Sequence, residues 1–213
     1  MLRAQHSNSV LLSIMVSGMH GLVNRAIQCF VRDTYGNEIW LDVARGASLE
    51  GATFEAMLFY EDAVTDQVLA YIVTLLNKPR EEVLEDIGTY LVSHPQVEAL
   101  RRLLRFGGVD FMDFLHSLDD LPDRARMAVS DLELPRLELR TDEKNHMQLY
   151  VRSPHEGFGH VMLGVLRTMA DDYGALVFLD LRRMAPGEDV IDIALVETSF
   201  AEGRSFTLSA GKS

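Results

Sequence analysis

The pair His155-Glu156 brings together two residue types that hydrolytic chemistry uses, a titratable ring and a carboxylate. The two residues are neighbours in the chain rather than one helical turn apart, and the sequence contains neither H-E-x-x-H nor G-x-S-x-G. It also lacks a phosphate loop of the form G-x-x-x-x-G-K-S/T, and Gly157-Phe158-Gly159 lacks the third glycine of a dinucleotide fingerprint. The sequence therefore predicts a protein that is not an enzyme.

Cys29 is the only cysteine of the chain, which excludes an intramolecular disulfide and a thiolate metal cluster. Such a chain suits a reducing compartment, and we expect it in the cytoplasm. Cys29 lies on the apolar stripe of a predicted first helix, so we expect it to be a small core residue.

The charge balance limits the classes of partner. The chain has 20 Lys and Arg against 32 Asp and Glu, a net charge of −12. Because such a surface repels phosphate backbones and anionic lipids, we expect neither nucleic acid nor a membrane as a partner. The apolar run Val10 to Val16 is far shorter than the roughly 18 to 20 residues that span a bilayer.

The length of 213 residues, of which 47% are hydrophobic and 24% charged, predicts a globular protein with a sizeable core. No Ser, Gly or Pro-rich linker divides the chain, which favours one domain over residues 19 to 198, with a tail from 199 to 213. We expect residues 1 to 18 to be an extension ahead of the domain. They weakly resemble a signal peptide, although no A-x-A cleavage site follows.

Two patterns of apolar residues divide this domain. Up to about Val129 the apolar residues recur at helical spacing, and the predicted helices end at breaks marked by Gly or Pro. Beyond Leu134-Pro135 the period changes to two, which predicts a hairpin, then a helix from Gly157 to Asp172, and then two further strands. The chain therefore reads as an α+β domain, with a helical part followed by a mostly antiparallel four-stranded sheet and one late helix.

Three stretches carry a family resemblance. M-H-G-L-V-N begins at Met19 and leads to Tyr35-Gly36, F-L-H-S-L-D-D-L begins at Phe114, and S-P-H-E-G-F begins at Ser153. In order and spacing they resemble the H-NOX (HNOB) family, the heme nitric oxide/oxygen-binding domains found alone in bacteria and at the N-terminus of the soluble guanylate cyclase β subunit. The resemblance extends to about Val196. It implies the H-NOX fold, heme as the class of ligand, and a role in nitric oxide sensing and signal transduction.

The resemblance also places the family's functional residues on this sequence. Where the family's F-L-x-x-L-D-x-L-H carries the proximal heme ligand, this chain has Pro122, which offers no lone pair to iron. Of the Tyr, Ser and Arg that hold the heme propionates, the positions are Val151, Ser153 and His155, so the serine alone is kept. A histidine makes one bond where an arginine makes a bidentate pair, which predicts a much weaker clamp.

The local pattern around Pro122 carries its own expectations. Phe111, Leu115 and Leu118 lie on one helical face, and residue 122 follows on that face, so it should point into the interior. The resemblance implies a heme-type pocket there, near Leu118, Val151 and His155. Because proline breaks a helix interior, we expect a helix to restart there with Asp119 or Asp120 as its cap. The simplest alternative is that Pro122 only opens a helix in a packed domain.

Two other histidines are weaker candidates for an iron ligand. His116 precedes Pro122 by six positions, about 240° around a helix, and so belongs to a different face. His20 lies in the first helical turn, which the resemblance places near the distal side of a heme.

We therefore expect a sensor-like regulatory domain of the H-NOX type whose heme ligation is compromised at Pro122. The alternative is a heme-free interaction module on the same fold, with its pocket filled by side chains or by another apolar small molecule. The two differ in whether bulky residues occupy the space beside Leu118, Pro122 and Val151. The resemblance implies a separate signalling partner, such as a histidine kinase or a cyclic-dinucleotide enzyme.

Overall fold

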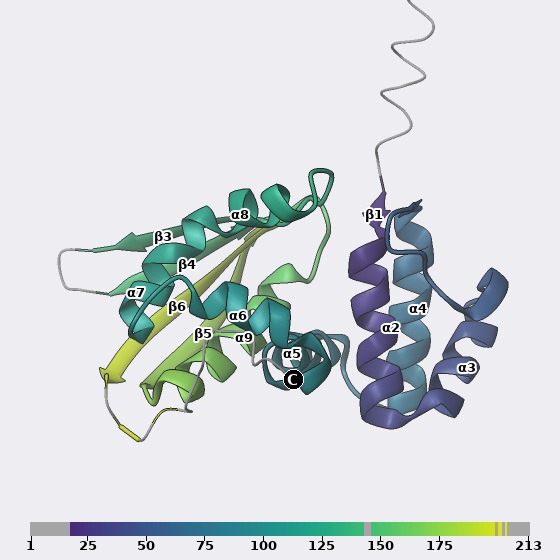
Figure 1. Cartoon of the computed structure of the whole chain (residues 1–213), viewed down its shortest axis with the longest axis horizontal. Coiled ribbons are helices and arrows are strands. Elements are labelled where there is room, and N and C mark those ends of the chain that lie inside the picture. Colours follow the sequence, from purple (N-terminus) through teal and green to yellow (C-terminus); the bar gives the residue numbers. More distant parts are fainter. Residues whose placement is uncertain (1–17, 143–145, 199, 202, 204–213) are drawn as a thin grey trace, which may run out of the picture. The chain divides into compact units, whose positions relative to one another are not determined.

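The computed structural model describes residues 18–142, 146–198, 200–201 and 203. The chain divides into two compact units, residues 1–77 and 78–213 (Figure 1). The predicted extension and tail fall almost entirely outside the described residues, so the boundaries at 18/19 and 198/199 stay predictions. In the described part of the chain, no helix combines the length and the apolar character that crossing a bilayer requires.

The first unit is helical apart from one short strand pair. Two of its helices were predicted, whereas α3 is too short for its buried Trp40, Val43 and Ala44 to set up a recognisable period. The elements are β1 (Met19–His20), α2 (Gly21–Tyr35), α3 (Asn37–Gly46), η1 (Glu50–Ala52), β2 (Phe59–Tyr60) and α4 (Asp62–Leu76), with β1 and β2 antiparallel.

Residues at both ends of α2 explain its length. The Nδ1 atom of His20 accepts a hydrogen bond from the N–H of Leu22 at 3.1 Å and so caps the helix. Gly36 ends it with a φ of 99°, a conformation that favours glycine. Inside the unit, the Thr65 hydroxyl of α4 donates to the Asn24 side-chain oxygen of α2 at 2.7 Å, and both residues are buried.

The second unit holds the remaining helices and a four-stranded sheet. The predicted order of helices, hairpin, helix and two strands is confirmed. Its elements are α5 (Arg80–Ser93), η2 (Pro95–Val97), α6 (Glu98–Arg105), α7 (Phe111–His116), η3 (Ser117–Asp120), α8 (Leu121–Ala128), β3 (Arg136–Thr141), β4 (Met147–Arg152), α9 (Phe158–Tyr173), β5 (Leu176–Ala185) and β6 (Glu188–Glu197).

The sheet has the strand order β3-β4-β6-β5, and every neighbouring pair is antiparallel. Alternate side chains point to opposite faces, and one face carries Leu149, Val151 and Ile191, which belong to the buried core together with residues of α7 and α9. The opposite face carries charged residues, Arg152 and Glu138 among them. The architecture is α+β, as the sequence predicts.

Helices α5 and α9 approach each other closely because each has a glycine at the crossing. A Cβ on Gly88 would lie 2.0 Å from the carbonyl oxygen of Val161, and one on Gly164 would lie 2.1 Å from that of Glu85. Neither backbone oxygen can move aside without shifting its helix. The two glycines therefore set the distance between α5 and α9.

Candidate functional site

The segment around Pro122 consists of two short helices joined by a 3-10 turn. Asp110 caps helix α7, and its side chain accepts the N–H of Asp113 at 2.9 Å. The chain then tightens into η3 and restarts as α8, with Pro122 in the first turn. The predicted helix restart at the proline is confirmed.

The predicted capping of α8 by an aspartate side chain is wrong. Asp120 occupies the N-cap position, but its side chain makes no capping hydrogen bond. The neighbouring Asp119 turns instead to the sheet, where its Oδ1 accepts the N–H of Leu139 in β3 at 2.8 Å. The carboxylate therefore fixes η3 to the sheet edge rather than stabilising the new helix.

The expectation that Pro122 shares the interior face of Leu118 stays a prediction. Leu118 is fully buried and Leu121 is 6% exposed, whereas Pro122 is half-buried. A 3-10 turn has three residues per turn, so residues three apart lie on one face. Leu121 therefore continues the face of Leu118, and Pro122 follows it in the first turn of α8.

Arg124 of α8 connects the helices of this segment. Its Nη2 donates to the carbonyl oxygen of Ser117 at 2.9 Å, and its Nη1 donates to that of Leu103 in α6 at 3.4 Å. These carbonyls belong to helix ends, where intrahelical donors are lacking. The guanidinium thus fixes α8 against the ends of η3 and α6.

The three predicted clamp residues lie along β4 and the loop that follows it. Val151 is 2% exposed and belongs to the same buried cluster as Leu118 and Leu121. Ser153 donates its N–H to the Gly187 carbonyl at 2.9 Å, and its hydroxyl oxygen accepts the N–H of His155 at 3.1 Å. Ser153 and His155 are half-buried and form one turn, whereas Val151 packs in the core.

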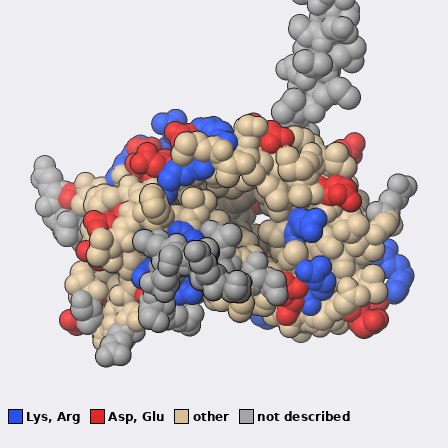
Figure 2. Space-filling model, in the orientation of Figure 1, with Lys and Arg blue, Asp and Glu red and all other residues tan. Residues whose placement is uncertain are grey.

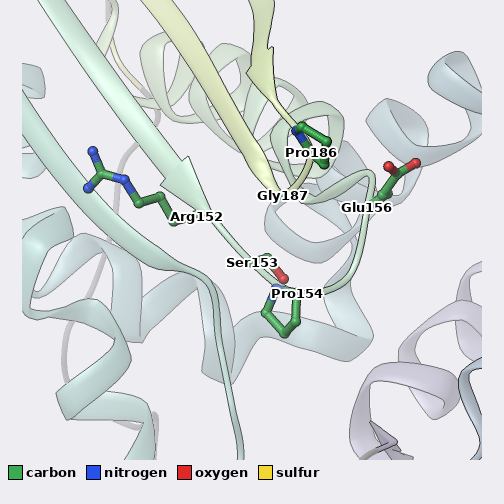
Figure 3. A pocket seen from close by; sticks show the side chains of 6 residues that line it. All are labelled: Arg152, Ser153, Pro154, Glu156, Pro186 and Gly187. Carbon is green, nitrogen blue, oxygen red and sulfur yellow. The ribbon is translucent and has the colours of Figure 1, made fainter.

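A shallow hollow of about 440 Å³ lies beside this turn. Figure 3 shows that the Arg152 guanidinium points away from Ser153 and Pro154, and that the Glu156 carboxylate lies at the other side. The lining residues are Arg152, Ser153, Pro154, Glu156, Pro186 and Gly187. Of the predicted site residues, Ser153 alone lines this hollow.

Arg152 is engaged on the outer face of the sheet. Its Nη1 lies 2.6 Å from Glu138 Oε2 and its Nε lies 3.0 Å from Glu188 Oε1, so it bridges β3 and β6. Hydrogen bonds from Arg140 and Arg152 lower the pKa of Glu138 from 4.5 to about 2. The guanidinium groups of Arg140 and Arg152 also lie over the Tyr150 ring, 4.2 Å and 5.2 Å from its centre.

The weaker ligand candidates lie apart in the fold. His116 is exposed at the end of α7, as expected of a surface residue. His20 is 3% exposed, caps α2 and meets the Phe59 ring edge-on at 5.0 Å. Cys29 is half-buried rather than a core residue, and Arg32 Nη2 donates to its sulfur at 3.7 Å. Among the described residues, no three His, Cys, Asp or Glu side chains gather as a metal site.

Sequence reasoning missed the Arg152 network. The signal was available, because Glu138 and Arg140 alternate with apolar residues on one predicted strand while Tyr150 and Arg152 do so on the next. A hairpin register would have brought them to one face.

Figure 2 shows acidic and basic side chains interspersed on the face in view, an arrangement that does not favour a polyanion as partner.

Comparison with known proteins places this geometry in context. Residues 20–179 match the model of the Haem-NO-binding family, HNOB. Soluble guanylate cyclase gcy-31 of Caenorhabditis elegans is 23% identical over 154 residues, which are 72% of this chain and 22% of that protein. Soluble guanylate cyclase 89Da of Drosophila melanogaster is 20% identical over 158 residues, 74% of this chain and 24% of that protein. The chain thus spans about a quarter of the length of these relatives.

Solved structures share the fold. An H-NOX protein from S. oneidensis in the Fe(II)NO ligation state matches with a TM-score of 0.70 and 15% identity, covering 83% of this chain and 99% of that one. The Fe(II) unliganded H-NOX protein from K. algicida matches with a TM-score of 0.72 and 17% identity, covering 84% of this chain and 97% of that one.

Proposed function

Because the chain belongs to the Haem-NO-binding (H-NOX) family, we propose that it is a sensor-like regulatory domain whose helix α8 supplies no axial ligand to a heme. H-NOX domains are typically heme-based gas sensors and are not themselves catalytic. The observation that carries the proposal is Pro122 in the first turn of α8. Its ring nitrogen is part of the peptide bond and has no lone pair for iron.

The residues present do not fit the way the family holds heme. Beyond Pro122, the tyrosine position of the propionate clamp is Val151, which is buried in the core. The arginine position is His155, whose ring can make one bond to a carboxylate where an arginine makes a bidentate pair. Arg152 is the cationic residue nearest in sequence to these clamp positions, and it forms ion pairs with Glu138 and Glu188. A propionate would have to compete with these carboxylates for the guanidinium.

The packing of the second unit favours a second candidate, a heme-free interaction module. Leu118, Leu121 and Val151 are at most 6% exposed and belong to one buried cluster. Side chains that already occupy this space leave less volume for a porphyrin or for another apolar small molecule. The two candidates share the fold and the regulatory role and differ in whether any heme is bound.

In either case we propose that the signal passes to a separate protein, such as a histidine kinase or a cyclic-dinucleotide enzyme. The matching relatives are named soluble guanylate cyclases, and this chain corresponds to about a quarter of their length. We expect the signal to leave through the surfaces of α2 and α8 if a ligand shifts either helix between two packings. A cytoplasmic location stays an expectation from the single cysteine.

Absorption spectra test the proposal. We expect the native chain, expressed with a heme supply, to lack the strong Soret band of a five-coordinate histidine complex. If the iron ligand is all that the pocket has lost, Pro122→His should gain such a band. Asp120→His places a histidine at an exposed neighbouring position and serves as the control, which should gain no band. Failure of Pro122→His to gain the band would favour the heme-free module, and a histidine-type band in the native protein would refute both.

A further inference from the structure

The two edge strands of the sheet are protected differently. At the β3 edge, the Leu139 N–H is taken by Asp119, and η3 and α8 lie against the strand. At the other edge, no strand within the described part of the chain pairs with the outer side of β5. An open strand edge presents N–H and C=O groups that can pair with another strand.

β5 also exposes two large apolar side chains. Phe178 is 68% exposed and belongs to the face of the sheet that points away from the core, and Met184, which lies at the register shift between Arg183 and Ala185, is 58% exposed. Leu181, on the opposite face, is half-buried and packs at the margin of the core. An additional strand beside the regular part of β5 would cover Phe178 and Leu181.

The charges on β5 are unbalanced within one chain. Asp180 is paired in register with Asp192 of β6, which places two carboxylates side by side on one face. Arg182 lies with its Nη2 2.5 Å from Asp192 Oδ2. Within the described part of the chain, no cationic side chain pairs with Asp180, which is exposed. The Asp180 carboxylate is therefore available to pair with a cationic side chain of another molecule.

We propose that β5 pairs with β5 of a second copy of this chain, antiparallel, about a two-fold axis beside Leu181. In this register Asp180 faces Arg182 of the second copy, and the same pair forms again on the other side of the axis. Leu181 faces Leu181 of the second copy at the axis. Opposite charges and apolar side chains directly across an antiparallel pair stabilise it.

The charges select this register over its neighbours. Residues that face each other in an antiparallel pair point to the same side of the sheet, so the axis has to pass beside a residue that faces its own copy. An axis at Asp180, Arg182 or Arg183 would oppose two like charges, and an axis at Leu179 would set Phe178 against Asp180. Among these axes, the one at Leu181 alone sets opposite charges against each other.

The interface is short, so the dimer should be weak. The β5–β6 register shifts between Leu176 and Val177 and again between Arg183 and Ala185, which confines regular pairing to the middle of the strand. An interface of this size belongs to the transient class. We expect the average mass of the full chain to rise with concentration from that of one chain toward that of two.

Two charge reversals give the sharpest test, read by light scattering or sedimentation. Asp180→Arg opposes two pairs of cations in a homodimer, and Arg182→Asp opposes two pairs of carboxylates, so each variant alone should stay monomeric. Mixed together they restore both opposite-charge pairs, and a heterodimer should form. Circular dichroism checks that each variant is folded, and Asp119→Ala, at the other edge of the sheet, should dimerise like the native chain.

A cross-link tests the register. In the Cys29→Ser background, the thiols introduced by Leu181→Cys should oxidise to a covalent dimer, because Cα atoms across an antiparallel pair lie about 4.5 to 5.5 Å apart. Monomeric native chain at every concentration, a dimer unaffected by either reversal, or no rescue in the mixture would overturn the proposal. These outcomes would leave the heme proposal untouched.

Discussion

The Asp119 carboxylate accepts the N–H of Leu139 at 2.8 Å and thereby joins the turn before Pro122 to the outer strand of the sheet. This bond satisfies a donor at the sheet edge and fixes the position at which α8 begins. The start of α8 is thus held by the sheet rather than by a cap of its own.

Replacing Asp119 by Ala should lower the free energy of unfolding by about 1 kcal/mol, the net worth of one such hydrogen bond. Urea denaturation followed by circular dichroism measures the change. Asp120→Ala is the matched control, because that side chain makes no capping bond and is likewise exposed. Equal losses in the two variants would contradict the role assigned to Asp119.

The crossing of α5 and α9 gives a prediction whose sign opposes helix propensity. Alanine is favoured over glycine within a helix by about 1 kcal/mol, yet a Cβ at Gly164 would lie 2.1 Å from the Glu85 carbonyl oxygen. Gly164→Ala should therefore destabilise the protein by roughly 1 to 3 kcal/mol, the usual cost of overpacking. An increase in the denaturation midpoint would show that the helices are not held at this distance.

Glu138 should make stability depend on pH in the acid range. Arg140 and Arg152 lower the pKa of its carboxyl from 4.5 to about 2, so its contribution is complete above pH 4.5 and is lost as the pH falls toward 2. Carbon NMR titration of the carboxyl should give a midpoint near 2, and Arg140→Gln should raise it. Glu138→Gln should flatten the acid limb of the stability curve. A midpoint near 4.5 in the native protein would show that the arginine contacts do not persist in solution.

The sequence predicts the regular parts of this fold because their signals are local. The helix ends at Tyr35-Gly36 and before Lys78-Pro79, and the hairpin around Asp142, depend on short-range patterns that the structure confirms. The 3-10 turn before Pro122 was missed because nothing in the spacing of Leu118 and Pro122 signals it. The Asp119 contact joins residues twenty positions apart, beyond the reach of capping rules.

The sequence identifies the residue types of the candidate site, but it does not predict how their side chains are arranged. Pro122, Val151 and His155 are identified by position alone. The engagement of Arg152 by two glutamates and the burial of Val151 depend on the register between β3, β4 and β6, which sets the partners of each side chain.

The heme content of the native chain, purified after expression with a heme supply, tests the central claim most directly. We predict that its absorption spectrum lacks the Soret band of a five-coordinate histidine complex, because Pro122 cannot coordinate iron from α8. A native protein that carries a full complement of heme and shows that band would contradict the account.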